Sequence, residues 1–218
     1  MDMLLSLRYN FLFIHIAKTG GTSIRAALRR YKYRDPYLPL FFICSRISAI
    51  SGHRLGCKIP RHAKAIAAYE MLPRELYNKL FKFVFIRNPW DLQVSSYHHI
   101  ERERPHLLKE ISSFEQFIKW KLSTNRTYQY HLDTSIELQS EYITDLKGHV
   151  IVDYIGRYER LEEDFRAICR RINIQPPKLP RKRQAKQRET YHKYYNAETA
   201  QLVAEYFKRD IEMFGYSF

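Results

Sequence analysis

FLFIHIAKTGGTSIRAALRR, residues 11–30, is the stretch that decides the fold. Its first six residues are a short, largely apolar run rich in aromatic and β-branched side chains, which predicts a fully buried strand. The loop KTGGTS at residues 18–23 ends this strand, and apolar residues then return from Ile24 to Tyr31 at the spacing of one helix face. Strand, glycine turn and helix in this order bring backbone N–H groups and a helix N-terminus around an anion. The stretch therefore predicts a phosphate-binding loop, with an ordinary strand-to-helix turn as the alternative.

The composition limits the class of protein. The 218 residues, 45% of them apolar, suffice for one globular domain with a substantial core. A formal net charge of +14 predicts an anionic partner or substrate and leaves nucleic acid, a charged glycan and a polyphosphate nucleotide open. The three cysteines show no CxxC spacing, so we expect free thiols in a reducing, cytoplasmic compartment. The first residues do not read as a signal peptide, and no run reaches the roughly 18 apolar residues of a membrane span.

Two further strands are expected along the chain, at residues 81–86 (FKFVFI) and 150–155 (VIVDYI). Helix signals follow each strand, with Asn88 as an N-cap after the first and an apolar face at residues 161–172 after the second. The alternation predicts a single P-loop-like α/β domain over residues 1–218, with a central, mainly parallel sheet flanked by helices on both faces. Such sheets bind ligands at the carboxyl ends of their strands, where Lys18, Arg87 and Arg157 all fall.

Other segments are predicted less sharply. After Ser113, a helix cap, four residues stand at helical spacing: Phe114, Phe117, Ile118 and Lys121. Residues 123–137 are polar and irregular, and we place a flexible, substrate-facing loop there. A long helix is expected to begin at Asn196, as its N-cap, and to end at Gly215. Residues 41–50 fit a helix or a strand, and the basic stretch at residues 181–188 fits a flap over a phosphate, an acceptor contact or a solvated loop.

Arg87 and Ser95 form the second candidate phosphate site. Arg87 stands at a strand tip and can hold a phosphate with two hydrogen bonds, while Ser95, about two helical turns later, can donate another. The alternatives are a structural ion pair between Arg87 and Asp91, and a small residue at a packed helix crossing for Ser95. Together with the loop at residues 18–23, the pair predicts a ligand that carries two separate phosphate groups.

HIAKTGGTS followed by FKFVFIRNPWDLQVSSYH resembles the sulfotransferase family, in its carbohydrate-type branch with bacterial members. The likeness continues through HAKA, YIGRYERLEEDF and the C-terminal residues, and so covers nearly the whole chain. The family's donor is 3′-phosphoadenosine 5′-phosphosulfate (PAPS), and its nucleotide product is PAP. The resemblance implies that the first motif holds the 5′-phosphosulfate, that Arg87 and Ser95 hold the 3′-phosphate, and that Arg157 helps on the cofactor side. The first motif comprises Lys18, Thr19, Gly20, Gly21, Thr22 and Ser23. Ala17 and Leu92 depart from the family pattern, which often has proline and arginine there.

Sulfuryl transfer needs a base for the acceptor proton and positive charge at the leaving phosphate. Lys18 is the natural leaving-group stabiliser, and the HAKA match points to His62 as the base, because a histidine pKa lies near the working pH. His15, His53 and Glu70 compete for the role of base. The resemblance also implies that Gln139, Ser140 and Tyr142 line the acceptor side, with ordinary loop polarity as the alternative.

Two other functions fit the sequence less well. A P-loop nucleotide kinase or NTPase would place its lysine after the glycines and would need a metal-binding aspartate, whereas Lys18 precedes Gly20 and Asp153 is expected inside a strand. A non-enzymatic RNA- or polyanion-binding module would need a basic, aromatic face without paired phosphate sites. We therefore expect a PAPS-dependent enzyme with no metal and no nucleic-acid partner. Its acceptor is expected to be a glycan or another hydroxyl compound, either anionic or neutral, and the oligomeric state is left open.

Overall fold

The computed structural model describes residues 3–33, 43, 47, 59–180 and 189–218. His53, Cys44, Cys57, the basic stretch at residues 181–188 and nearly all of residues 41–50 lie outside this part of the chain. The chain divides into two compact units. Unit 1 comprises Met1–Ile16, Gly20–Ile86 and Glu141–Lys182, and unit 2 comprises Ala17–Thr19, Arg87–Ser140 and Arg183–Phe218.

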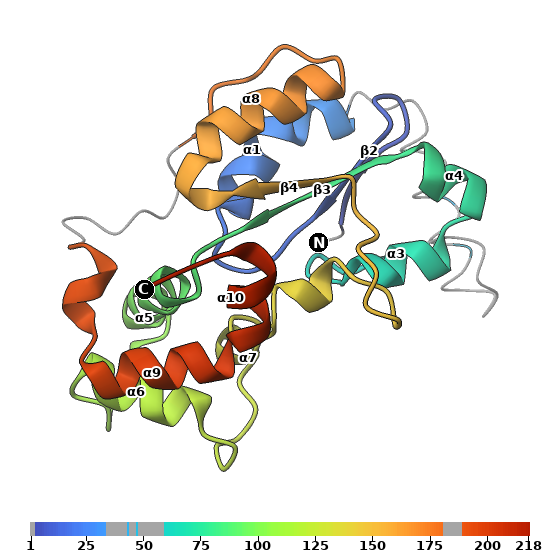
Figure 1. Cartoon of the computed structure of the whole chain (residues 1–218). Helices are drawn as coiled ribbons and strands as arrows, with labels where there is room; N and C mark the ends of the chain where they lie inside the picture. The colour runs from blue at the N-terminus through green and yellow to red at the C-terminus, as the bar shows by residue number, and fades with distance from the viewer. Residues whose placement is uncertain (1–2, 34–42, 44–46, 48–58, 181–188) are drawn as a thin grey trace. The chain divides into compact units, whose positions relative to one another are not determined.

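Unit 1 is built on a four-stranded sheet in the order β1-β2-β3-β4 (Figure 1). The strands are β1 (Leu4–Ser6), β2 (Phe11–Ile14), β3 (Phe81–Ile86) and β4 (Tyr154–Arg157). The edge strand β1 is antiparallel to β2, while β2, β3 and β4 run parallel to one another. The structure confirms the mixed α/β class and the mainly parallel sheet.

The third expected strand is displaced along the sequence. It was predicted at residues 150–155 and is observed at Tyr154–Arg157, because Val150 forms an isolated antiparallel bridge with Thr144 instead. Asp153 thus lies before the strand, not inside it. Its carboxylate accepts from the backbone N–H of Lys82 at 2.7 Å and lies 2.9 Å from the ammonium of the same residue. This ion pair fixes Asp153 at the amino end of β4, opposite to the end where ligands of parallel sheets bind.

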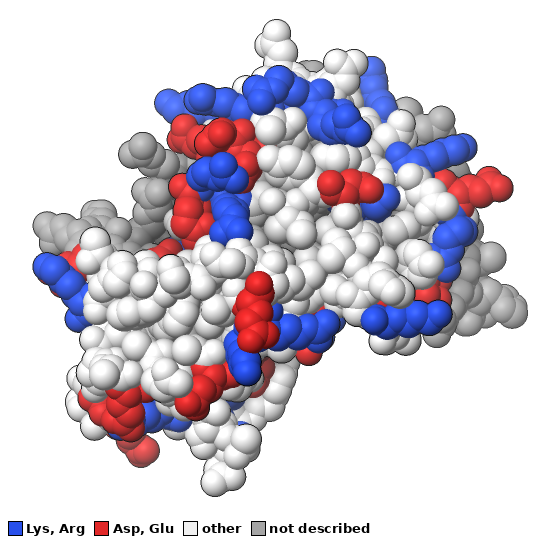
Figure 2. All heavy atoms as spheres, viewed as in Figure 1, with Lys and Arg blue, Asp and Glu red and all other residues white. Residues whose placement is uncertain are grey.

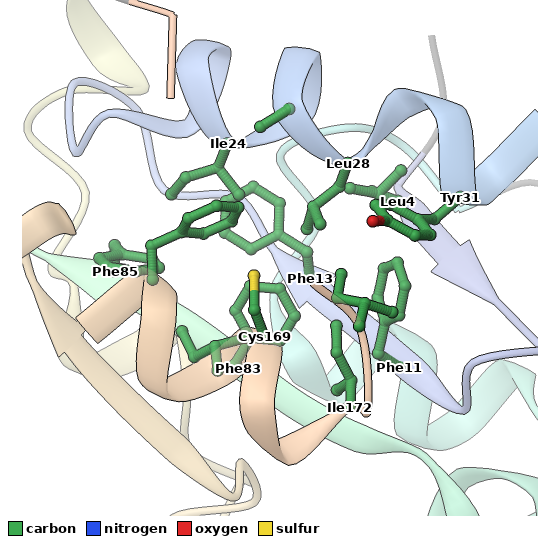
Figure 3. Close-up of a cluster of buried hydrophobic side chains, with 14 residues drawn as sticks. Leu4, Phe11, Phe13, Ile24, Leu28, Tyr31, Phe83, Phe85, Cys169 and Ile172 are labelled. Carbon is green, nitrogen blue, oxygen red and sulfur yellow. The ribbon is translucent and has the colours of Figure 1, made fainter. Parts of the chain in front are cut away.

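One face of the sheet is covered by α1 (Gly21–Tyr33) and α8 (Leu161–Arg171) (Figure 1). Phenylalanines of β2 and β3 meet apolar side chains of both helices in one buried cluster, as Figure 3 shows for Phe13, Phe83, Ile24 and Cys169. The clustered phenylalanines alternate along each strand, so a single face of the pleated sheet supplies them. This packing holds α1, the helix that starts at the glycine loop, against the strand that precedes the loop.

The remaining elements of unit 1 are short. α3 (Ala65–Met71) lies on the other side of the sheet from α1 and α8, and α4 (Arg74–Lys79) leads into β3 (Figure 1). The 3-10 turn η3 (Tyr158–Arg160) joins β4 to α8. Acidic residues occupy the first turn of α8 and arginines its last turn, which favours the helix dipole. Both signs of charge are visible over this part of unit 1 in Figure 2.

Unit 2 is helical. Its elements are α5 (Pro89–Glu103), η1 (Pro105–Leu108), α6 (Phe114–Leu122), α7 (Tyr130–Asp133), η4 (Tyr191–Tyr194), α9 (Ala197–Tyr206) and α10 (Lys208–Phe214). The turn η2 (Ser140–Tyr142) begins with the last residue of a unit 2 segment, and its other two residues belong to unit 1. Asn88 caps α5, Ser113 caps α6, and Asn196 forms a capping box with Thr199, so all three predicted caps are confirmed. A core around Val94, Phe117 and Val203 joins these helices.

Two predictions for unit 2 need correction. Residues 123–137 are not simply a flexible loop, since they contain α7, bury Leu132 and hold a 2.6 Å ion pair between Arg126 and Asp133. The expected C-terminal helix is divided at Phe207 into α9 and α10. It ends as predicted at Gly215, whose φ of 63° is the left-handed conformation of a glycine C-cap. Within the described ranges, no helix is both long and apolar enough to cross a membrane.

Candidate active site

The glycine loop contains a strained lysine. Lys18 has a φ of 66°, a left-handed conformation that non-glycine residues adopt at some energetic cost, and Gly20 follows with a φ of 85°. Strain of this kind persists where the surrounding structure enforces it, and it clusters at ligand sites. Thr19 is fully buried. The left-handed backbone of Lys18 is a feature that the sequence did not reveal.

Gly21, the first residue of α1, has no room for a side chain. A Cβ atom built on it would stand 2.0 Å from Nε2 of His15. A Cβ on Gly20 would lie 3.1 Å from Leu161, with the additional strain of a positive φ. The two glycines therefore serve different purposes: Gly20 makes the turn, and Gly21 lets the helix start against the His15 ring. The first turn of α1 presents backbone N–H groups there, as helix N-termini do.

His15 is held neutral and its orientation is fixed. Nε of Arg61 donates a 2.9 Å hydrogen bond to Nδ1 of His15, so this nitrogen carries the lone pair and Nε2 carries the hydrogen. Nη2 of the same arginine donates to Oγ1 of Thr22 at 3.3 Å. Burial lowers the pKa of His15 well below its usual value, and electrostatic interactions with His62, Arg61 and Arg25 lower it further. Because its accepting nitrogen is already bonded, His15 is poorly placed to act as a base.

His62 has the opposite tautomer. Its Nδ1 lies 2.9 Å from the backbone oxygen of His15, and a carbonyl can only accept, so Nδ1 carries the hydrogen and Nε2 the lone pair. Burial lowers the pKa of His62 to about 4 despite this hydrogen bond, and Arg61 and Arg25 contribute to the decrease. The ring is therefore neutral at pH 7, and the pKa near the working pH that was expected for this histidine from the sequence is not found. Of the two described histidines considered as bases, only His62 has the tautomer with its lone pair on Nε2.

Arg87 and Lys18 are brought together within unit 2. Nη1 of Arg87 donates to the backbone oxygen of Lys18 at 2.8 Å, and Nε of Arg87 lies 2.6 Å from Oδ2 of Asp91. The ion pair that the sequence suggested as an alternative role thus exists. These two contacts orient the guanidinium of Arg87, which is only 2% exposed. Ser95 lies on α5, half-buried, beside the fully buried Ser96.

The segment expected to line the acceptor side is buried. Gln139 is 1% exposed and its side chain pairs with the backbone of Arg87, while Ser140 and Tyr142 are fully buried. Both backbone N–H groups of residues 139 and 140 bond to the carboxylate of Asp210. Burial raises the pKa of Asp210, and hydrogen bonds from Ser140 and Gln139 oppose the increase.

Lys121 is a buried lysine that the sequence reasoning did not interpret. Its ammonium on α6 donates to Gln93, Ser96 and Ser135 at 2.6, 2.8 and 2.9 Å, and the residue is fully buried. Burial lowers its pKa well below the usual lysine value, with further decreases from the charges of Arg126 and Lys18. Two of its partners, Gln93 and Ser96, flank Ser95 on α5.

The other candidates are placed less distinctively. Arg157 ends β4, and its backbone N–H donates to Asp164 at 2.6 Å, while the side chain of Asp164 also lies 4.0 Å from Arg160. Arg157 therefore contacts Asp164 through its backbone. Glu70 is exposed on α3. Among the residues that the structure describes, no group of three or more His, Cys, Asp or Glu side chains is arranged to hold a metal ion.

These features define an α/β protein in which a glycine loop and a helix follow the strand β2 of a mainly parallel sheet. A model of the sulfotransferase family matches residues 1–217, and the chain belongs to this family. Among curated proteins, it is 31% identical over 102 residues to an uncharacterized protein of Archaeoglobus fulgidus, in an alignment that covers 46% of this chain and 74% of the relative. No solved structure matches the chain. The family supports sulfuryl transfer as the general reaction.

Proposed function

We propose that the protein transfers a sulfuryl group from PAPS to a hydroxyl or amine of an acceptor, with a carbohydrate as the acceptor class. The observation that carries the proposal is the 2.8 Å hydrogen bond from Arg87 to the backbone of Lys18. It joins the key residues of the two predicted phosphate-binding motifs within one unit. A ligand with two phosphate groups, which is the chemistry of the PAPS nucleotide, suits two such motifs.

The donor set of the glycine loop fits a phosphosulfate. It combines the ammonium of Lys18, two hydroxyls and the N-terminus of the 13-residue helix α1, all of which favour an anion. The hydroxyls are those of Thr22 and Ser23. The proposal assigns the 5′-phosphosulfate to residues 18–23 and the 3′-phosphate to Arg87 and Ser95. Arg157 is assigned to the cofactor side because it ends β4 at the edge of the sheet where β2 and β3 also end.

The proposed reaction is an in-line displacement at sulfur. The bound donor supplies an activated sulfuryl group on a phosphate leaving group. His62 takes the acceptor proton on Nε2 as the new O–S or N–S bond forms, and a neutral ring is required for this step. Lys18 stabilises the negative charge on the 5′-phosphate oxygen as the old S–O bond breaks and its electron pair stays with the phosphate.

The acceptor assignment depends on charge and family. A formal net charge of +14 favours an acidic or already sulfated glycan over a neutral one. We also propose that the protein acts in the cytoplasm, in keeping with Cys169, which is a buried free thiol. Nucleic acid is not part of the proposal.

Ligand-dependent thermal stabilisation without metal tests the cofactor. A ligand that binds only the folded protein raises the melting temperature, and at 100 times its Kd it adds about 2.7 kcal/mol of stability. PAP is expected to give such an increase in EDTA. An increase with ATP and Mg²⁺ but not with PAP would favour a kinase, and one with RNA alone would favour a binding module. Labelled PAPS offered to a panel of glycans, alcohols and amines then identifies the acceptor.

A further inference from the structure

The side-chain amide of Gln139 forms two hydrogen bonds with the main chain of Arg87. The backbone N–H of Arg87 donates to Oε1 at 2.9 Å, and Nε2 donates back to the backbone oxygen of Arg87 at 2.8 Å. The glutamine is 1% exposed and the arginine 2%. This is the hydrogen-bond pattern of a neighbouring strand, supplied by a single side chain 52 residues further along the chain.

Gln139 is in turn fixed by the C-terminal helix α10. Its backbone N–H donates to Oδ2 of Asp210 at 2.7 Å, and the N–H of Ser140 donates to Oδ1 at 2.9 Å. Asp210 is fully buried, and one carboxylate that accepts two N–H groups makes strong, charge-assisted hydrogen bonds. All of these residues belong to unit 2.

The side chain of Arg87 starts from this anchored backbone. Its guanidinium then contacts Asp91 and the backbone oxygen of Lys18. Asp91 orients one edge of the guanidinium, and Gln139 sets where the side chain leaves the main chain. A hydrogen-bonded series therefore runs from Asp210 through Gln139 to Arg87, with every distance between 2.6 and 2.9 Å.

We propose that Gln139 and Asp210 are positioning residues for recognition of the 3′-phosphate of the nucleotide. This inference rests on the proposed function, because it takes Arg87 as the 3′-phosphate ligand. An arginine holds a phosphate with two hydrogen bonds only when its planar group is correctly placed, so small displacements of its backbone weaken recognition. Gln139 thus acts on the cofactor through Arg87 and does not line the acceptor side.

The test must separate positioning from simple stabilisation of the fold. Affinities for PAP and for adenosine 5′-phosphate, which lacks the 3′-phosphate, are measured by titration calorimetry well below the melting temperature. Gln139→Met keeps the length of the side chain and removes both hydrogen bonds to Arg87. We expect it to weaken PAP binding about tenfold, the equivalent of about 1.4 kcal/mol, and adenosine 5′-phosphate binding less than about twofold. A general loss of structure would weaken both ligands together.

Two variants complete the experiment. Asp210→Asn keeps the size of the side chain but turns an NH₂ group towards one of the two N–H donors, so the same selective loss is expected. Gln116→Met removes an exposed amide of α6 in the same unit and should change neither affinity. Asp210→Asn carries the test if Gln139→Met does not fold, and if neither variant folds the network serves the fold and the inference is wrong.

The outcomes distinguish this inference from the proposed function. If the wild-type protein binds PAP no more tightly than adenosine 5′-phosphate, the assignment of Arg87 fails and the inference fails with it. If the wild-type protein prefers PAP and Gln139→Met keeps that preference, the proposed function stands and the positioning role is excluded.

Discussion

Nδ1 of His62 lies 2.9 Å from the backbone oxygen of His15. This contact fixes the tautomer of His62 and leaves the lone pair on Nε2, as a proton acceptor requires. The neighbouring ring of His15 has the reverse tautomer because Arg61 donates to its Nδ1. Two histidines whose ring centroids are 4.5 Å apart are thus chemically distinct, with their lone pairs on different nitrogens.

The pH dependence of the reaction should report the lowered pKa of His62. The base must be unprotonated, so kcat/KM should rise with pH through about 4 and then stay level between about pH 5.5 and 8. His62→Ala should lose turnover while it still binds PAP. Initial rates in overlapping buffers measure the profile, and an acid limb near the ordinary histidine value of 6.5 would contradict the assigned environment of His62.

The lowered pKa of His62 also makes the stability of the fold depend on pH. Between about pH 4 and 6.5 the unfolded state binds the proton that folded His62 excludes, so the free energy of unfolding rises with pH across this window. Conversely, the stability is lost as pH falls from 6.5 towards 4. One such group contributes a slope of at most about 1.4 kcal/mol per pH unit. Urea unfolding of wild type and His62→Gln at several pH values should show a smaller slope for the variant.

Lys18 should show a conflict between stability and activity. Its φ of 66° suits glycine, so Lys18→Gly should be about 1 kcal/mol more stable than Lys18→Ala, although both should lose turnover. Lys119 on α6 is a control, because in an ordinary helix alanine is the more stable of the two by about 1 kcal/mol. Chemical denaturation gives both differences. If alanine were more stable than glycine at position 18 as well as at position 119, Lys18 would not be strained.

The regular elements of the sheet could be predicted from local pattern. β3 is an apolar run bounded by a cap signal, and it was placed at its observed residues, 81–86. The displacement of β4 could not be predicted, since it depends on the bridge between Val150 and Thr144 and on the pairing of Asp153 with Lys82. The pattern of apolar residues identifies a buried segment, whereas the ends of a strand depend on which neighbouring segment its backbone bonds to.

Some residues of the candidate site could be predicted from the sequence and others could not. Lys18, Arg87 and His62 carry local signals, but Arg61 and Asp210 act through partners 46 and 71 residues away, which no local pattern reveals. The burial of Lys121 could have been predicted from the sequence. This lysine stands at the helical spacing of Phe114, Phe117 and Ile118, so its position on the apolar face of α6 already implied a buried ammonium that needs partners.

Gly21 should not tolerate alanine. A Cβ atom there would stand 2.0 Å from Nε2 of His15, and the His15 ring is held by Arg61, so Gly21→Ala should cost about 3 kcal/mol. Gly148→Ala is the matched control, because Gly148 has a φ of +86° but nothing within 4 Å of a Cβ. It should cost only about 1 kcal/mol, from backbone strain.

A second substitution locates the clash. His15→Ala removes the ring that the new Cβ would meet, so the double variant should be less destabilised than the sum of the two single changes. Urea unfolding of the wild type, both single variants and the double variant measures this coupling. Additive effects would place the cost of Gly21→Ala elsewhere than at His15.

Lys121 should support the fold through its three acceptors. Lys121→Met replaces the ammonium by an apolar side chain of similar length, and so removes the donor to the buried oxygens of Gln93, Ser96 and Ser135. The two serine hydroxyls still pair with each other at 3.0 Å, so Oε1 of Gln93 is the main group left unsatisfied. One such group costs about 1–3 kcal/mol, and removal of a desolvated ammonium offsets part of this cost, so a net loss of about 1–2 kcal/mol is expected. Lys119→Met, on the exposed side of the same helix, removes only surface ion pairs to Glu115 and Glu198, which water screens, and should cost less. Urea unfolding compares the two variants, and equal losses would show that the buried network contributes no more than a surface ion pair.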